Sequence, residues 1–184
     1  MSAHTRGLTL ELVDRAGVLS FRNLLPGSSV YISLGDGDGA PRRLYTPIAV
    51  SDHWFMIIVK RFARSAITHD LFDAVPGDTV VQVSWPHGRF EYTPNQYATL
   101  AIITSGSGIT VVYRVIEALL ADRADRTRVL LVYQNRSRPE TLLHPELCQL
   151  AAAHRDRFGL VFVNKLSGRL SAQPAPNVRY IGGE

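Results

Sequence analysis

The chain has 184 residues, enough for one large domain or two small ones, and its 46% hydrophobic and 20% charged residues are ordinary for a globular protein. Its net charge of +4 comes from scattered Arg and Lys residues, whereas a nucleic-acid-binding protein usually carries a dense basic stripe. No apolar run approaches the length that spans a bilayer and no signal core follows the N-terminus, so we expect a cytoplasmic protein that binds neither membranes nor nucleic acids.

The first half of the chain has the pattern of a small antiparallel β-barrel. Its strand-like segments are short, they alternate between apolar and polar residues or are rich in β-branched residues, and glycine and proline turns separate them. Several short strands at this spacing predict a barrel, which a short helix at residues 68–75 covers. The predicted strands are residues 8–13, 29–34, 55–60 and 79–84.

The second half alternates strands with helices, which predicts a parallel sheet with right-handed crossovers. The predicted strands are residues 99–104, 129–133, 160–163 and 178–181, and the predicted helices are residues 110–122 and 139–154. We assign residues 1–96 to the barrel domain and residues 97–184 to the α/β domain. Because only two helices connect these strands, we expect one apolar face of the sheet to be partly exposed, which favours self-association, docking onto a partner or lower stability of this domain.

A glycine-rich turn, Ser105-Gly106-Ser107-Gly108-Ile109-Thr110, lies between the first strand and the first helix of the second half. Small residues let the backbone approach a phosphate closely, and the following helix offers free N–H groups and the positive end of its dipole. A glycine-rich turn of this kind also occurs without any ligand, and Val111 stands where the usual dinucleotide fingerprint has its third glycine. The motif alone therefore leaves both a nucleotide site and a simple chain reversal open.

A second cluster, Arg43-Leu44-Tyr45-Thr46-Pro47, lies in the first half. In an extended strand, Arg43 and Tyr45 point to one face and Thr46 points to the other. A guanidinium pairs with phosphate oxygens, a tyrosine ring offers a flat stacking surface, and a hydroxyl can bond the edge of a heterocycle. An ordinary barrel strand with a surface arginine is the alternative that these residues alone leave open.

Five motifs, taken in order, resemble the ferredoxin–NADP reductase superfamily and together cover nearly the whole chain. They are Arg43-x-Tyr45-Thr46-Pro47, Val59-Lys60, Pro76-Gly77-Asp78 with Pro86-x-Gly88-x-Phe90, Gly106-x-Gly108-Ile109-Thr110, and Tyr133-x-Asn135-Arg136. The chain is most similar to the reductase components that serve oxygenases, including the phenylacetyl-CoA epoxidase reductase type. The resemblance implies an FAD-binding barrel and an NAD(P)H-binding α/β domain, which pass electrons from NAD(P)H through FAD to a protein or small-molecule acceptor.

The resemblance also implies roles for residues of the barrel. Arg43 would hold the flavin pyrophosphate, Tyr45 would stack on the isoalloxazine ring, and Thr46 would hydrogen-bond near the N5 edge of that ring. Thr68 matches the hydroxyl residue that caps a short phosphate-binding helix. Further flavin contacts are implied for Leu44, Val59, Lys60, Ala66 and Ile67.

In the second half, the resemblance implies that the nicotinamide and pyrophosphate of NAD(P)H lie along the glycine-rich turn, with the adenosine half beside Asn135 and Arg136. The implied catalytic residues are Tyr45, Thr46 and Thr110, and no protein acid or base is needed because the hydride passes between cofactors. A ferredoxin or an oxygenase component is the implied acceptor. We expect no metal site, because a lone cysteine cannot hold an iron–sulfur cluster. The implied NAD(P)H contacts are Gly106, Ser107, Gly108, Ile109, Thr110, Asn135 and Arg136.

Some positions depart from the family pattern. Ser65 replaces a glycine of the flavin phosphate loop, and Val111 replaces the proline that closes the Gly-Ile-Thr-Pro motif. The family carries a Cys-Gly-Pro motif on a later strand, whereas here residues 178–181 are followed by Gly182-Gly183-Glu184 and the chain ends. We therefore expect a C-terminally shortened domain without the usual last strand and helix. Two alternatives to an active reductase stay open: a non-catalytic flavin-binding or partner-binding module, and a fragment of a longer reductase. The choice between NADH and NADPH and the choice between FAD and FMN stay open as well.

Overall fold

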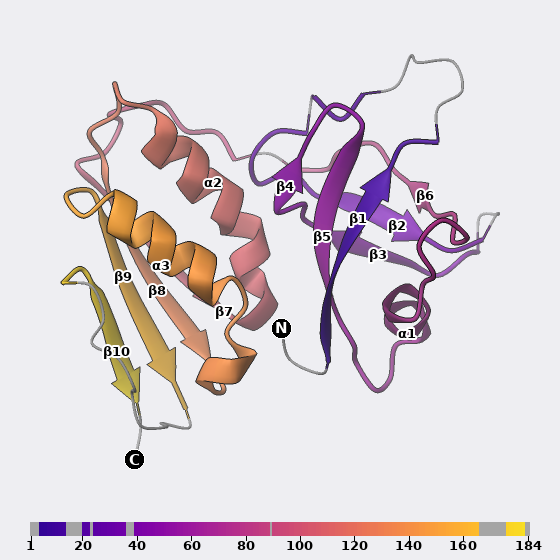
Figure 1. Ribbon diagram of the computed structural model, residues 1–184. Coiled ribbons are helices and arrows are strands. Elements are labelled where there is room, and N and C mark those ends of the chain that lie inside the picture. Colours follow the sequence, from indigo (N-terminus) through magenta and orange to yellow (C-terminus); the bar gives the residue numbers. More distant parts are fainter. Residues whose placement is uncertain are drawn as a thin grey trace. The chain divides into compact units, whose positions relative to one another are not determined.

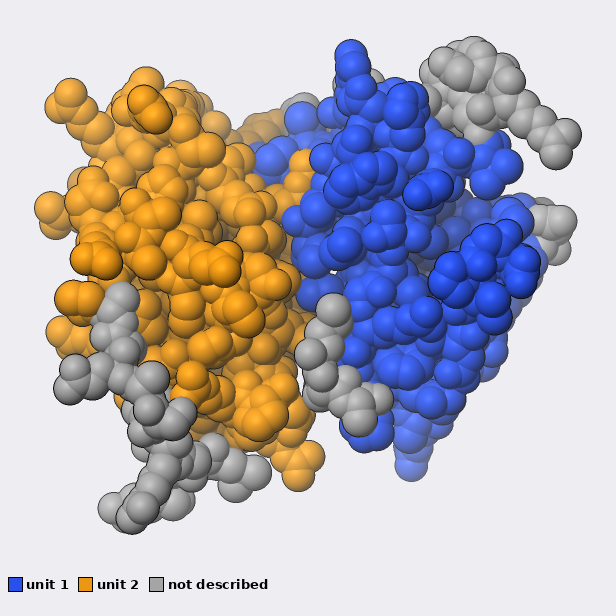
Figure 2. Space-filling view, viewed as in Figure 1, with its two compact units in different colours: residues 1–90 blue, residues 91–184 orange. Residues whose placement is uncertain are grey.

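The computed structural model of the chain describes residues 4–13, 20–22, 24–35, 39–88, 90–165 and 176–182. Gly183 and Glu184, which belong to the expected shortened end, lie outside the described residues. The chain divides into two compact units, Met1–Phe90 and Glu91–Glu184, drawn in different colours in Figure 2. Among the described residues, no helix combines the length and the apolar character needed to cross a membrane.

The described residues of the first unit form two three-stranded antiparallel sheets and one helix, which agrees with the predicted antiparallel barrel domain (Figure 1). One sheet has the order β1-β5-β4 and the other has the order β3-β2-β6. The helix α1 (Ala66–Phe72) follows β5 in the chain. The strands are β1 (Thr5–Glu11), β2 (Val30–Ser33), β3 (Arg42–Tyr45), β4 (Ala49–Val50), β5 (Trp54–Lys60) and β6 (Gln82–Val83).

Aliphatic and aromatic side chains from both sheets and from α1 form the core of this unit. Ile67 and Leu71 lie four residues apart, so they share one face of α1 and pack into the core together. Full burial of such a side chain contributes roughly 1.5–3 kcal/mol to folding. The buried residues of the core are Leu24, Val30, Ile32, Phe55, Ile57, Val59, Ile67 and Leu71.

The second unit has a parallel sheet of order β10-β9-β8-β7, as the alternating pattern predicts (Figure 1). Successive strands step in one direction along the sheet, so two right-handed crossovers place both long helices on the same face. The elements are β7 (Thr99–Ser105), η1 (Gly106–Gly108), α2 (Ile109–Ala121), β8 (Arg128–Asn135), η2 (Arg138–Glu140), α3 (His144–Ala153), β9 (Phe158–Asn164) and β10 (Val178–Gly182).

The two faces of this sheet differ in burial, and the pairing register shows which residues share each face. The row Ile102, Leu131, Leu160 and Val178 belongs to the covered face, where the last three side chains are at most 4% exposed. On the opposite face, Ile103 is 82% exposed, Ile181 is 55% exposed and Leu130 is 39% exposed. One apolar sheet face is therefore partly uncovered.

Candidate functional site

Arg43 and Tyr45 share the inner face of the β3-β2-β6 sheet. They are paired with Ile32 and Val30, whose side chains are fully buried, whereas Leu44 between them is 47% exposed. Nη1 of Arg43 donates a hydrogen bond to Oγ of Ser65 at 2.6 Å. The Arg43 guanidinium carbon also lies 5.2 Å from the centre of the Phe62 ring. The strand thus directs a cationic side chain to the loop that precedes α1.

Backbone and side-chain hydrogen bonds hold this loop against α1. The Thr68 hydroxyl donates to the Ser65 carbonyl at 2.9 Å and accepts from the Phe62 N–H at 3.2 Å. The N-cap position belongs to Ser65, and Thr68 lies three residues further on. The capping role implied for Thr68 is therefore wrong, because its hydroxyl joins the loop to the first helical turn instead.

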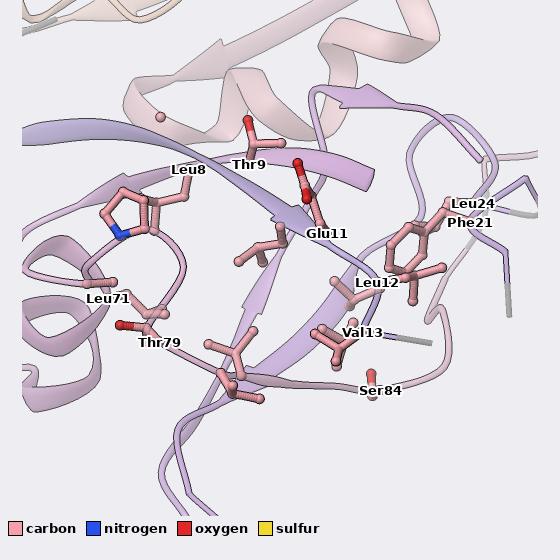
Figure 3. Close-up of a pocket in the computed structure, with 18 of the residues that line it drawn as sticks. Leu8, Thr9, Glu11, Leu12, Val13, Phe21, Leu24, Leu71, Thr79 and Ser84 are labelled. Carbon is pink, nitrogen blue, oxygen red and sulfur yellow. The ribbon is translucent and has the colours of Figure 1, made fainter. Parts of the chain in front are cut away.

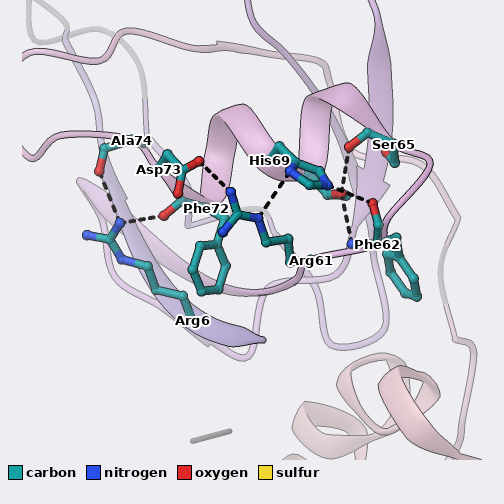
Figure 4. A network of polar contacts seen from close by, with 9 residues as sticks. Arg6, Arg61, Phe62, Ser65, His69, Phe72, Asp73 and Ala74 are labelled. Atoms are coloured by element: carbon teal, nitrogen blue, oxygen red, sulfur yellow. Dashed lines mark hydrogen bonds and ion pairs between the residues drawn. The ribbon is translucent and has the colours of Figure 1, made fainter. Parts of the chain in front are cut away.

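Arginine side chains fix the rest of α1, as Figure 4 shows. Arg61 donates to Nδ1 of His69 at 3.1 Å and pairs with the Asp73 carboxylate at 2.8 Å. From β1, Arg6 donates to the carbonyl oxygens of Phe72 and Ala74 at 2.6 and 3.1 Å. These hydrogen bonds and the ion pair anchor α1 together with the loop at residues 62–65. The position of Ser65 relative to Arg43 is therefore fixed.

Tyr45 and Thr46 lie where β3 ends. The Tyr45 hydroxyl is buried and has no hydrogen-bond partner among the described residues. Burial raises the pKa of Tyr45, although the neighbouring Arg43 acts in the opposite direction, so the phenol stays protonated and can donate a hydrogen bond. The Thr46 hydroxyl is buried and lies 2.7 Å from the Ser29 hydroxyl. If Ser29 donates in that pair, the proton of Thr46 remains available to a ligand.

The other residues implied to contact the flavin offer it backbone groups rather than polar side chains, or lie at the edge of the site. The side chains of Val59 and Ile67 belong to the hydrophobic core, so a cofactor contact from either residue would have to come from its backbone. Ala66 and Ile67 are the first residues of α1, where N–H groups have no acceptor within the helix. Lys60 is half-buried at the end of β5. Arg43, Tyr45 and Thr46 supply the side-chain chemistry, and the start of α1 supplies backbone donors.

A cavity of about 1160 Å³ also lies in the first unit, between β1 and the segment that leads from α1 to β6 (Figure 3). Leu8, Leu71 and Thr79 are among the residues that line it, and most of its lining is apolar. Arg6 reaches it, but the Arg6 guanidinium is occupied by the two carbonyls at the end of α1. None of the residues assigned to the flavin lines this cavity, so the candidate site does not lie there.

The glycine-rich turn of the second unit connects β7 to α2 through η1. Gly106 has a φ of +51°, a conformation that L side chains rarely adopt. The fully buried Tyr133 donates from its hydroxyl to the Gly106 carbonyl at 2.8 Å. A Cβ atom on Gly108 would lie 2.6 Å from Oγ1 of Thr104. The backbone conformation therefore favours glycine at position 106 and packing favours it at position 108, and the turn brings the N-terminus of α2 next to the end of β7.

Thr110 and Ser107 face each other across this turn. The Thr110 hydroxyl donates to the Ser107 carbonyl at 2.9 Å, which closes the turn against the first residues of α2. Ile109 is fully buried, so only its backbone is accessible to a ligand at this point. Small residues form the exposed surface of the turn, and close approach of a phosphate to the backbone requires such residues.

Two asparagines lie at the carboxyl ends of β8 and β9, and one of them was missed in the sequence. Asn135 and Asn164 are paired in the register of these strands. Nδ2 of Asn135, whose side chain is 5% exposed, and Oδ1 of Asn164 are buried without a hydrogen-bond partner in the described part of the chain. Arg136 follows Asn135 and is exposed. The position of Asn164 directly after an apolar strand, like that of Asn135, is the signal that would have revealed it.

This arrangement fits ligands with phosphates and polar heterocycles. In open α/β sheets, ligands bind outside the carboxyl ends of the strands, which is where Asn135 and Asn164 lie. The described residues contain no group of three or more His, Cys, Asp or Glu side chains that would hold a metal ion. The first unit thus offers Arg43 with the hydroxyls of Tyr45 and Thr46, and the second offers Arg136, the amides of Asn135 and Asn164 and the backbone N–H groups at the start of α2.

Comparison with known proteins identifies relatives of this chain. Residues 102–177 match the family of oxidoreductase NAD-binding domains. Over 124 residues the chain is 34% identical to NADH-cytochrome b5 reductase 1 of Eremothecium gossypii, covering 66% of this chain and 43% of that protein. Over 152 residues it is 32% identical to the protein of the same name from Debaryomyces hansenii, covering 82% of this chain and 51% of that protein. The chain thus spans about half the length of these curated relatives.

Solved structures confirm the predicted fold class. The cytochrome b5 reductase domain of Ulva prolifera nitrate reductase matches with a TM-score of 0.77 and 24% identity, over 100% of this chain and 73% of that chain. The flavohem-like FAD/NAD-binding domain of nitric oxide dioxygenase from Vibrio cholerae matches with a TM-score of 0.73 and 22% identity, over 100% of this chain and 74% of that chain. An antiparallel barrel-like domain followed by a parallel α/β domain is the architecture of this chain.

Proposed function

This chain belongs to the ferredoxin–NADP reductase superfamily, and we propose that it is an NAD(P)H-dependent flavin oxidoreductase with FAD on its first unit and NAD(P)H on its second. The match of residues 102–177 to oxidoreductase NAD-binding domains supports the second assignment. The observation that carries the proposal is that the family motifs contain buried polar groups without a hydrogen-bond partner among the described residues. Tyr45 provides such a group in the first unit and Asn135 provides one in the second.

The residues of the first unit would bind and orient the flavin. Arg43 presents guanidinium donors beside the start of α1, where a diphosphate would meet both a cation and backbone N–H groups. Tyr45 would give its ring face and its unpaired hydroxyl to the flavin, and Thr46 would donate its hydroxyl proton to the heterocycle edge. FAD, when bound, would accept two electrons as a hydride and release them one at a time.

The residues of the second unit would hold the nucleotide that donates the hydride. The turn at Gly106–Gly108 and the first N–H groups of α2 would receive its pyrophosphate. Asn135 and Arg136 would contact the adenosine half, where their amide and guanidinium can bond ribose hydroxyls. No residue needs to transfer a proton, so the protein contributes binding, orientation and the exclusion of water.

A protein that accepts one electron at a time is the proposed acceptor. The five sequence motifs suggested a ferredoxin or an oxygenase component, with a likeness to the phenylacetyl-CoA epoxidase reductase type. The relatives found by comparison are named for NADH and cytochrome b5. We therefore propose NADH as the first donor to test and cytochrome b5 as the first acceptor.

Flavin binding tests the proposal at its first step. The purified protein is mixed with FAD, passed through a gel-filtration column, and the flavin that co-elutes is released and identified by chromatography. We expect one FAD for each chain, and co-elution of FMN in preference to FAD would correct the assigned cofactor. A folded protein that retains no flavin would refute the proposed function.

A further inference from the structure

Ser65 does not use its hydroxyl as a serine at the start of a helix usually does. It occupies the N-cap position of α1 with the extended backbone, φ −128° and ψ 103°, that is typical of an N-cap. A serine in this position normally accepts a hydrogen bond from an N–H of the first helical turn. Here no side-chain cap bond forms, and Oγ of Ser65 accepts from Nη1 of Arg43 instead. The hydroxyl therefore stabilises an arginine on a distant strand rather than its own helix.

The backbone of Ser65 is fixed firmly enough for this contact to set the position of the arginine. Its N–H donates to the Phe62 carbonyl at 3.0 Å. Its carbonyl accepts from the N–H groups of Thr68 and His69 at 3.2 and 3.3 Å and from the Thr68 hydroxyl at 2.9 Å. His69 in turn lies within 3.0 Å of the Phe62 carbonyl. These bonds join the turn to α1, whose other end is bonded by Arg6 of β1 and by Arg61, the residue after β5 (Figure 4).

Two contacts fix the plane of the Arg43 guanidinium. The Ser65 hydroxyl holds Nη1 at 2.6 Å, and the Phe62 ring lies 5.2 Å from the guanidinium carbon. A guanidinium carries five N–H donors, and the Ser65 hydroxyl takes one of them. Donors that Ser65 does not use thus stay available to an anion while the side chain is held in one orientation. A long side chain that is already ordered loses less conformational entropy when a ligand binds.

We propose that Ser65 is a positioning residue that holds Arg43 ready for the diphosphate of a flavin nucleotide, and that it thereby makes the first unit select FAD over flavins without a diphosphate. This inference rests on the proposed function, because it concerns the same flavin site. Riboflavin carries no phosphate and should gain nothing from the contact.

The test compares FAD with riboflavin in titrations of flavin fluorescence on the full chain. Ser65→Ala should weaken FAD binding about tenfold and change riboflavin binding less than twofold. Ser65→Thr keeps the hydroxyl and should restore FAD binding to within about threefold of the parent. Ser51→Ala removes a serine hydroxyl away from the site and is the matched control. In an Arg43→Ala background, Ser65→Ala should have no further effect on FAD.

The outcomes separate this inference from the proposed function. If the parent binds FAD and the Ser65→Ala variant binds it equally well, the positioning role is overturned and the flavin site stands. An equal loss of FAD and riboflavin in Ser65→Ala would show that Ser65 only stabilises the loop, and it too would overturn the inference. A parent protein that is folded by circular dichroism but binds neither flavin would overturn both the inference and the proposed function.

Discussion

Arg42 and Arg43 are neighbours on β3, but only one of them points toward the candidate flavin site. Arg43 reaches Ser65, whereas the guanidinium of Arg42 lies over the Tyr31 ring, 4.8 Å from its centre. We expect Arg43→Ala to weaken FAD binding by about 1.5–3 kcal/mol, the scale of a hydrogen bond to a charged group. Arg42→Ala removes the same charge and is the matched control. Titration of flavin fluorescence measures both variants, and equal FAD affinity in both would contradict the assignment.

Asn164 extends the candidate nucleotide site to β9. Its Oδ1 atom is buried without a partner in the part of the chain that is described, and its strand neighbour Val163 points to the other face. We expect Asn164→Ala to weaken NADH binding by about 0.5–1.5 kcal/mol, which is the net value of a neutral hydrogen bond. Gln134→Ala, on the opposite sheet face beside Val163, is the control. Calorimetric titration with NADH decides between them, and a larger effect from Gln134→Ala would count against this site.

At the residue scale, the sequence predicted which side chains share a face of β3, but it did not predict what those side chains contact. The alternation of Arg43 and Tyr45 is a local property of a strand, so it could be inferred without the fold. The contact between Arg43 and Ser65 spans 22 positions, and no local pattern predicts it. Asn164, like Asn135, ends an apolar strand, but the pairing of the two follows only from the register of β8 and β9.

At the scale of elements, the periodic segments were predicted well and the interrupted ones were not. The predicted helix at residues 139–154 is split into η2 and α3, and Leu143 between them has a φ of +56°. Pro145 lacks an N–H, so it fits in the first turn of a helix and not in its interior. The predicted strand at residues 79–84 shortens to β6, because only Gln82 and Val83 pair with β2. These outcomes depend on single prolines and on pairing partners rather than on periodicity.

Asp125 joins the segment before β7 to the loop before β8. Its carboxylate accepts hydrogen bonds from the Tyr92 hydroxyl at 2.7 Å, the Thr127 N–H at 2.9 Å and the Asn95 N–H at 3.1 Å. Burial by itself raises the pKa of Asp125, but these donors outweigh it and lower the pKa to about 2. The bonds across residues 91–97 explain why Tyr92 and Asn95 belong to the second compact unit.

This carboxylate makes the stability of the second unit depend on pH. Because the pKa of Asp125 is lowered in the fold, its carboxylate stabilises the fold at pH values above the ordinary aspartate pKa of about 3.9. That contribution is lost as pH falls from about 4 to 2. Asp125→Asn should lower the free energy of unfolding at neutral pH by about 1–3 kcal/mol and make the acid loss shallower. Asp156→Asn, at an exposed position, controls for the change in net charge. Urea unfolding at several pH values measures this, and parallel acid profiles for the parent and Asp125→Asn would contradict it.

At the scale of the whole molecule, the presence of only two connecting helices predicted that one sheet face of the second unit would be partly uncovered. Ile103 and Val132 are paired in register on this face, and Ile103 is 82% exposed. Contiguous apolar surface of this kind is unusual on a soluble protein. Whether it leads to self-association or lower stability of the unit stays a prediction.

Dye binding tests the exposure of this face. We expect the parent protein to bind the hydrophobic dye ANS under native conditions, since ANS reports exposed apolar surface. Ile103→Lys should reduce dye fluorescence severalfold with a change in stability below about 0.5 kcal/mol, because the side chain is exposed. Leu25→Lys changes an exposed apolar residue of the first unit outside the lining of the cavity and is the control. An unchanged signal in Ile103→Lys would place the dye elsewhere.

Hydride transfer from a nicotinamide nucleotide to a bound flavin is the central step of the proposed function. The most direct measurement is the anaerobic titration of the FAD-loaded protein with NADH, followed through the absorption band of oxidised flavin. We expect about one equivalent of NADH to bleach the band and the reduction rate to saturate with NADH concentration. A protein that holds FAD and binds NADH, yet keeps its oxidised spectrum under excess NADH, would contradict it and would favour a flavin-binding module without reductase activity.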